Sequence, residues 1–202
     1  MKRIIWHWSA GGNKANGTDR RAYHIIIEGD GKVVKGNSPI SANARISNPR
    51  DTSTYAAHTG GLNTGSIGVS LAGMRGAQES PFRAGPSPIT QAQVDALIRV
   101  TADLCREYGI PVTDKTVLSH AEVEPRLGVK QRPRWDIAWL PGMTRAGDPM
   151  AIGDGLRDRV RDAMRARPVT SRPVADSPAP KTESNGLGAL IRRLLAWLGG
   201  RA

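Results

Sequence analysis

Short apolar runs alternate with polar, glycine-rich breaks along the first 120 residues of the chain. The runs that predict β-strands are residues 3–9, 25–27, 32–36, 66–71 and 116–118. The second and third of them flank an Asp-Gly turn, which predicts a β-hairpin. Between the first two strands, residues 11–19 are rich in Gly and Asn and predict a polar loop.

Helical spacing of apolar residues is confined to the second half of the chain. Beyond Thr90, which forms a capping-box sequence with Gln93, apolar residues recur every three or four positions as far as Tyr108. Residues 154–167 predict a shorter, charged helix. Residues 73–88 contain three prolines and predict an irregular loop that forms one wall of a groove. Strands followed by helices favour an α/β fold with a mixed central β-sheet flanked by helices.

The pattern changes after residue 167. Residues 168–186 contain four prolines among Ser, Thr, Asp and Lys, a composition that predicts a flexible linker. Residues 187–202 predict a basic amphipathic helix, whose apolar stripe spans 187–198. This helix is too short to cross a bilayer and suits the surface of an anionic membrane, and packing on the domain core is the alternative. We therefore expect one domain in residues 1–167, a linker and a C-terminal helix.

Composition narrows the range of partners. The chain has 202 residues, a formal net charge of +11 and a pI near 10.6, which favours an acidic partner. The sequence contains neither Cys/His finger spacing nor a ribonucleoprotein-type aromatic motif, so we expect no nucleic-acid binding. The single cysteine, Cys105, excludes an internal disulfide and lies on an apolar helix stripe, which predicts a core thiol. The apolar run near Met1 is too short for a secretory signal, so we expect synthesis in the cytoplasm.

Two histidines stand at the ends of predicted strands. His7 ends the first, and His120 follows residues 116–118 where that strand gives way to a loop; Asp136 lies sixteen residues further on. Two imidazoles and one carboxylate form a zinc set that leaves a fourth position open for water. The spacing alone leaves alternatives open, because His7 can be an ordinary strand histidine and Asp136 can pair with Arg134 at the surface.

Five segments, in this order, resemble the zinc-dependent N-acetylmuramoyl-L-alanine amidases, the superfamily that includes the peptidoglycan recognition proteins. They are Ile-Ile-Trp-His-Trp-Ser at 4–9, Tyr-His-Ile-Ile-Ile-Glu-Gly-Asp-Gly at 23–31, Asn-Thr-Gly-Ser-Ile-Gly-Val at 63–69, Ser-His-Ala-Glu-Val at 119–123 and Trp-Asp at 135–136. The resemblance covers about residues 1–145, in a compact form similar to phage or prophage endolysins.

The resemblance implies that His7, His120 and Asp136 bind Zn²⁺. It further implies hydrolysis of the amide that joins N-acetylmuramic acid to the first L-alanine of the peptidoglycan stem. The expected protein is a monomer that is made in the host cytoplasm and acts on the cell wall after release. A non-catalytic module that binds peptidoglycan is the alternative within the superfamily, and the complete ligand set favours the enzyme.

Further site residues follow from the same resemblance. Tyr23 matches the tyrosine of a Tyr-His pair, which implies a hydroxyl that stabilises the oxyanion, and simple packing is the alternative. His24 should point away from Tyr23, because side chains alternate along a strand. His58 matches a cleft histidine and is expected to contact substrate. Trp8 and Trp135 either stack on sugar rings or close an apolar shell around the metal.

Two positions depart from the family pattern. Ser70 stands where many relatives carry a glutamate that acts as a general base, so another group must carry out the acid–base catalysis. Arg134 replaces a lysine two residues before the last ligand. A guanidinium keeps the positive charge that stabilises an oxyanion but does not give up a proton, so we expect Arg134 to act electrostatically, with Lys130 as a weaker alternative cation.

Overall fold

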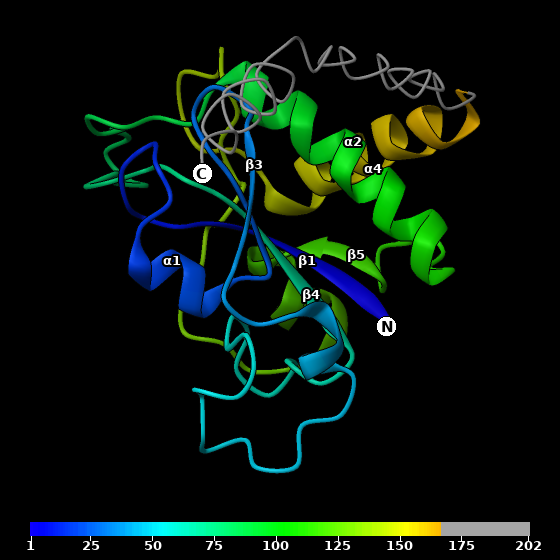
Figure 1. Cartoon of the computed structure of the whole chain (residues 1–202). Coiled ribbons are helices and arrows are strands. Elements are labelled where there is room, and N and C mark those ends of the chain that lie inside the picture. Colours follow the sequence, from blue (N-terminus) through cyan, green and yellow to red (C-terminus); the bar gives the residue numbers. More distant parts are fainter. Residues whose placement is uncertain (167–202) are drawn as a thin grey trace, which may run out of the picture. The chain divides into compact units, whose positions relative to one another are not determined.

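The computed structural model describes residues 1–166, which fold into one five-stranded sheet with helices around it (Figure 1). The strands are β1 (Arg3–Trp8), β2 (Ile25–Ile27), β3 (Val33–Lys35), β4 (Ser66–Leu71) and β5 (Val117–Ser119). The α-helices are α1 (Gly17–Ala22), α2 (Gln91–Tyr108), α3 (Val123–Leu127) and α4 (Pro149–Arg165), and the 3₁₀ helices are η1 (Ile40–Asn43) and η2 (His120–Glu122). The predicted linker 168–186 and the predicted helix 187–202 lie outside the described residues.

The strand order is β3-β2-β4-β1-β5. β1 runs parallel to both β4 and β5, β2 runs parallel to β4, and the hairpin partner β3 is antiparallel to β2. This arrangement confirms the predicted mixed sheet with flanking helices. Because parallel strands end at the same edge of a sheet, the carboxyl ends of β1, β4 and β5 lie together. His7 and Ser70 are paired in register there, so both side chains point to the same face.

The main core fills the face of the sheet that α2 and α4 cover (Figure 1). Trp6 is fully buried there, and its indole Nε1 donates to Thr101 Oγ1 of α2 at 2.9 Å. Thr90 and Gln93 form the predicted capping box at the start of α2. Cys105 is buried in this core, and burial raises the pKa of its thiol to about 11, which confirms the structural role expected for it. The opposite face carries the small cluster Ile5, Leu118 and Val123.

The structure corrects three expectations about local elements. α1 occupies the end of the predicted polar loop: Asn16 caps it reciprocally with Asp19, a polar signal that apolar periodicity does not report. Helix α4 begins at Pro149 rather than residue 154, because Asp148 accepts from Met150 N and proline fits the first turn. The segment after His120 is helical rather than irregular.

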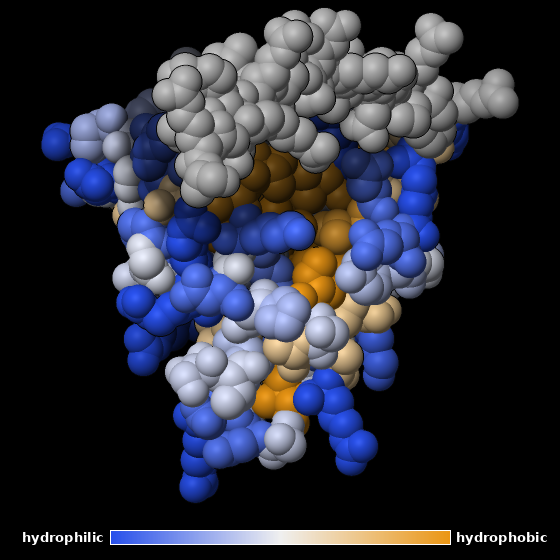
Figure 2. Space-filling view, in the orientation of Figure 1, coloured by the Kyte–Doolittle hydropathy of each residue, from blue (hydrophilic) through white to orange (hydrophobic). Residues whose placement is uncertain are grey.

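Figure 2 shows hydrophilic residues over much of the visible surface and an apolar hollow between them. A cleft of about 610 Å³ is lined by residues of β2, β3, η1 and α2 together with His24. Residues 73–88 contain no helix or strand, as predicted, and they line neither this cleft nor the one near His7, so their role as a groove wall stays a prediction. Among residues 1–166 no helix is long and apolar enough to cross a membrane.

Candidate metal centre

His7, His120 and Asp136 converge at the carboxyl edge of the sheet. His7 is the fifth residue of β1, and His120 opens the 3₁₀ turn that follows β5. Asp136 Oδ2 lies 3.5 Å from His7 Nδ1 and 3.3 Å from His120 Nδ1. One donor atom from each residue lies within 4.8 Å of the others, and all three residues are buried. The fold therefore brings together the three residues that the sequence analysis selected.

The donor set fits a zinc ion. Ligand atoms about 2.0–2.1 Å from a tetrahedral ion stand about 3.4 Å apart, which matches both imidazole–carboxylate distances. Within residues 1–166, Asp136 forms no ion pair with Arg132 or Arg134, so the alternative of a surface salt bridge is wrong. The fit rests on the chemistry and spacing of these side chains.

Electrostatics keep this carboxylate charged and the adjacent His7 neutral. Burial alone raises the pKa of Asp136, but hydrogen bonds from His120 and His7 outweigh it and lower that pKa to about 2. Burial lowers the pKa of His7 to about 4, against the opposing effect of Asp136. At neutral pH the site thus holds one negative charge with neutral imidazole at His7, the protonation state in which these groups bind a cation.

The turn that carries Asp136 is strained. Ile137 has a positive φ of 64°, a conformation that β-branched residues rarely adopt. Its side chain is buried in the main core, and Ala138 N donates to Trp135 O at 2.9 Å to close the turn. Strain of this kind persists only when the surroundings enforce it, and here it directs the carboxylate toward the two histidines.

The outer nitrogens of both histidines also have partners. His7 Nε2 lies 3.3 Å from His58 Nδ1, and the His58 ring packs so closely on β4 that a Cβ at Gly68 would come within 2.6 Å of it. His120 Nε2 lies 2.9 Å from Gln131 Oε1. The sequence analysis missed Gln131, because an amide in a basic loop carries no motif.

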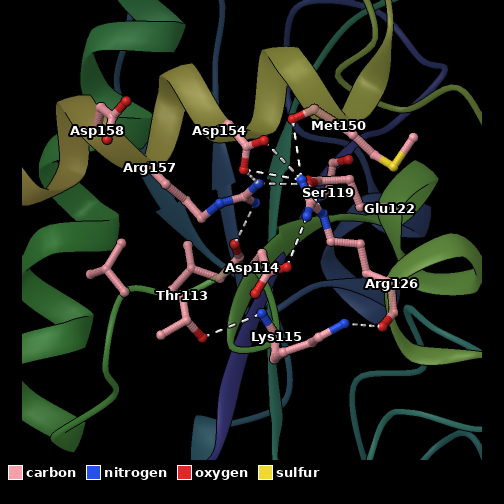
Figure 3. A network of polar contacts seen from close by, with 12 residues as sticks. Thr113, Asp114, Lys115, Ser119, Glu122, Arg126, Met150, Asp154, Arg157 and Asp158 are labelled. Atoms are coloured by element: carbon pink, nitrogen blue, oxygen red, sulfur yellow. Dashed lines mark hydrogen bonds and ion pairs between the residues drawn. The ribbon is translucent and has the colours of Figure 1, made fainter.

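A buried polar network around Glu122 ties η2, which begins at His120, to α3 and α4 (Figure 3). Glu122 Oε2 accepts from Ser119 N at 2.7 Å, and Glu122 Oε1 accepts from Arg157 Nη2 at 2.8 Å and from Arg126 Nε at 3.2 Å. Arg157 is fully buried and also donates to Val117 O of β5. Gly153 of α4 makes this approach possible, since a Cβ there would come within 2.3 Å of the Glu122 carboxylate.

A cleft of about 240 Å³ opens beside the three donors. Its lining residues are Trp8, Ser9, Ala10, Tyr23, His58, His120, Pro133, Arg134, Trp135 and Asp136. The ring centroid of Tyr23 lies 5.1 Å from that of His7, whereas His24 lines the larger cleft and accepts from Gly68 N, so the predicted alternation of Tyr23 and His24 is confirmed. The larger cleft holds no metal-ligand cluster, so we place the candidate site in the smaller one.

The two tryptophans differ in exposure. Trp8 is buried and packs edge to face against Trp135 at 4.6 Å, which leaves little of its ring for a sugar. Trp135 is half-buried at the cleft. Ser70 is fully buried beside His7, and its hydroxyl has no hydrogen-bond partner among the described residues.

Comparison with known proteins agrees with this site. The family model of the N-acetylmuramoyl-L-alanine amidases matches residues 1–137, a span that contains all three metal-ligand candidates. The chain therefore belongs to this family. No curated protein matches the chain.

Among solved structures, one similar chain is the N-acetylmuramyl-L-alanine amidase AmiD from E. coli in complex with anhydro-N-acetylmuramic acid-L-Ala-D-γ-Glu-L-Lys. The two share 20% sequence identity with a TM-score of 0.38, over 60% of this chain and 48% of that one. The present chain thus spans about half the length of that structure.

Proposed function

We propose that this chain is a zinc-dependent N-acetylmuramoyl-L-alanine amidase that cleaves the amide between N-acetylmuramic acid and L-alanine in bacterial peptidoglycan. The observation that supports this most is the convergence of His7, His120 and Asp136 at an open cleft, in a chain of this family. Three protein donors leave a coordination position for water or substrate, which is typical of hydrolytic rather than structural zinc sites.

When bound, a zinc ion supplies Lewis acidity that polarises the scissile carbonyl and makes water nucleophilic near neutral pH. Tyr23 donates a hydrogen bond to the carbonyl oxygen as negative charge develops, because burial raises the pKa of its hydroxyl and keeps it protonated. Arg134 adds positive charge from the loop before Asp136. The Ser70 hydroxyl cannot act as the general base that a carboxylate would be, so proton transfer falls to other groups in the cleft.

The exposure of the side chains that line the cleft indicates which of them can contact the substrate. Trp135 offers a partly exposed ring for a sugar face. His58 lines the cleft, and although its ring is buried against β4, the edge that faces the cleft can contact substrate. Trp8 acts through Trp135 by fixing its ring.

The test combines metal analysis with product analysis. We expect about one zinc per chain, dye release from labelled peptidoglycan, loss of release with a chelator and recovery with added zinc. Amidase cleavage exposes the amino group of L-alanine without new reducing sugar ends, so labelling of both ends separates this activity from a glycosidase. Binding to peptidoglycan with zinc present and no new amino ends would instead identify a non-catalytic recognition module.

We further propose that the protein acts in phage or prophage lysis, after release from the host cytoplasm, and that residues 187–198 engage an anionic membrane. The support is the sequence pattern of that segment, with its apolar stripe and two arginines. A chain that ends at Arg167 should keep its activity on purified peptidoglycan and lose binding to anionic liposomes.

Full-length variants Leu190→Glu and Leu194→Glu should lose the same liposome binding, and zwitterionic liposomes serve as the control. If the truncation unfolds the amidase domain, the segment packs on the core and the membrane role is wrong.

A further inference from the structure

The side-chain amide of Gln131 has an orientation that its neighbours determine. Its Nε2 lies 2.9 Å from the carbonyl oxygen of Gly60 and 3.4 Å from that of Val129. Both oxygens can only accept hydrogen bonds, so the amide NH₂ must face them. The amide oxygen Oε1 consequently faces His120 Nε2, at 2.9 Å.

An amide oxygen accepts and never donates, so the Gln131 contact favours a proton on His120 Nε2. In that tautomer Nδ1 presents its lone pair toward Asp136 Oδ2, 3.3 Å away, an arrangement that a cation between the two atoms stabilises, whereas without a cation the carboxylate favours a proton on Nδ1. We infer that Gln131 is a positioning residue that holds His120 in the one tautomer able to bind a metal through Nδ1. This inference rests on the zinc site of the proposed function.

Gln131 also joins three segments that are distant in sequence. Its side chain reaches Gly60 in the turn after His58, and its backbone N donates to Glu124 Oε2 of α3 at 3.0 Å. Gln131 itself belongs to the loop that ends at Asp136. The same amide therefore fixes the ring of one ligand and anchors the loop that delivers another.

The support of His7 is different. Its Nε2 faces His58 Nδ1 at 3.3 Å and Thr59 Oγ1 at 3.5 Å, and each of these atoms can donate or accept. The partners of His7 Nε2 thus favour neither tautomer, whereas the amide oxygen of Gln131 favours a proton on His120 Nε2. Both histidines are nevertheless supported from the same turn, residues 58–60.

Zinc affinity tests the role of the amide oxygen. Gln131→Leu removes the acceptor at similar volume and should raise the zinc dissociation constant about 10- to 100-fold, the usual effect of losing a ligand's hydrogen-bond partner. Gln91→Leu, at an exposed glutamine on α2 that contacts Asp95, is the matched control and should leave it unchanged. Gln131→Glu keeps an acceptor for His120 Nε2 but loses the donors to Gly60 O and Val129 O, so it should recover part of the affinity. The inference is wrong if the leucine and glutamate variants weaken binding alike, or if neither does.

A second readout needs neither zinc nor activity. Nitrogen-15 NMR of the metal-free full chain should show a larger share of His120 protonated at Nε2 than in the Gln131→Leu variant, where only Asp136 still attracts the proton, to Nδ1. Equal shares in the two proteins overturn the inference. If the unmodified chain binds no zinc, the proposed function fails, whereas tight zinc binding with an unchanged leucine variant removes only the role of Gln131.

Discussion

Two buried carboxylates, Glu122 and Asp136, flank the metal-ligand candidate His120, and they are stabilised in opposite ways. Glu122 is fully buried and receives hydrogen bonds from a backbone N–H and from the guanidinium groups of Arg126 and Arg157. Asp136 is also buried, but its close polar partners in the described chain are two imidazoles. Buried carboxylates need compensating partners, and the fold gives Glu122 two permanent cations, whereas Asp136 has only titratable imidazoles that can also bind a metal ion.

This difference distinguishes the residues around Glu122, which hold the fold together, from those around Asp136, which form the candidate site. Around Glu122 each local feature serves packing: Gly153 admits the carboxylate, and Arg157 ties α4 to β5. Around Asp136 the left-handed Ile137 costs free energy, and the carboxylate is held by two imidazoles rather than by guanidinium groups. Features that cost free energy without a structural return are expected at functional sites.

The largest expected effect follows removal of a metal-ligand candidate. Asp136→Asn and His120→Ala should each abolish peptidoglycan hydrolysis and reduce bound zinc well below one per chain, because two remaining ligands hold an ion weakly. At neutral pH the metal-free Asp136→Asn protein should unfold at a lower urea concentration than the metal-free parent, because the lowered pKa of Asp136 means that its charged form stabilises the fold. Zinc content and activity equal to the parent would exclude either residue from the site.

The second effect concerns the compensated carboxylate. Glu122→Gln leaves Arg157 buried without a carboxylate and should lower the free energy of unfolding by about 3–5 kcal/mol, with or without zinc. The double variant Glu122→Leu, Arg157→Met should cost less than Glu122→Gln, because no charge remains unpaired in the core. Urea denaturation of chelated protein measures all three. A Glu122 variant that loses zinc at unchanged stability would contradict the assignment of this network to the scaffold.

The sequence predicts these two regions unequally. Strand-end histidines, apolar spacing and the Asp-Gly turn are local signals, so the mixed sheet, α2 and the positions of His7 and His120 are predictable from them. Contacts between distant polar residues have no such periodicity. The pairing of Glu122 with Arg157, thirty-five residues away, and the contact of Gln131 with Gly60, seventy-one residues away, depend on how the elements dock. Helix α1 is missed because a short polar cap specifies it.

A third, smaller effect tests the oxyanion donor. Tyr23→Phe should keep the fold and the zinc while kcat falls about 10- to 1000-fold, the range expected for losing one donor or proton-transfer group. Tyr108→Phe, on α2 at the larger cleft, is the matched control and should turn over like the parent. The measurement is dye release at saturating substrate. An unchanged kcat in the Tyr23 variant would assign its ring to packing against His7.

The smallest expected effect is a dependence of the free energy of unfolding on pH in the metal-free protein. Burial lowers the folded-state pKa of His7 and of His24 to about 4, below the unfolded value of about 6.5. Between those values the unfolded chain binds protons that the folded chain refuses, so stability falls as the pH drops from about 6.5 to 4. Each histidine contributes a slope of at most about 1.4 kcal/mol per pH unit.

Asp136 extends the decline, because its lowered pKa of about 2 means that its stabilising contribution is lost as the pH falls from about 4 to 2. Urea denaturation of chelated protein at a series of pH values measures both windows. Asp136→Asn should remove the lower window and keep the upper one, because burial is the main cause of the histidine shifts. If the upper window disappears in Asp136→Asn, burial does not cause the histidine shifts, because Asp136 itself raises the pKa of His7.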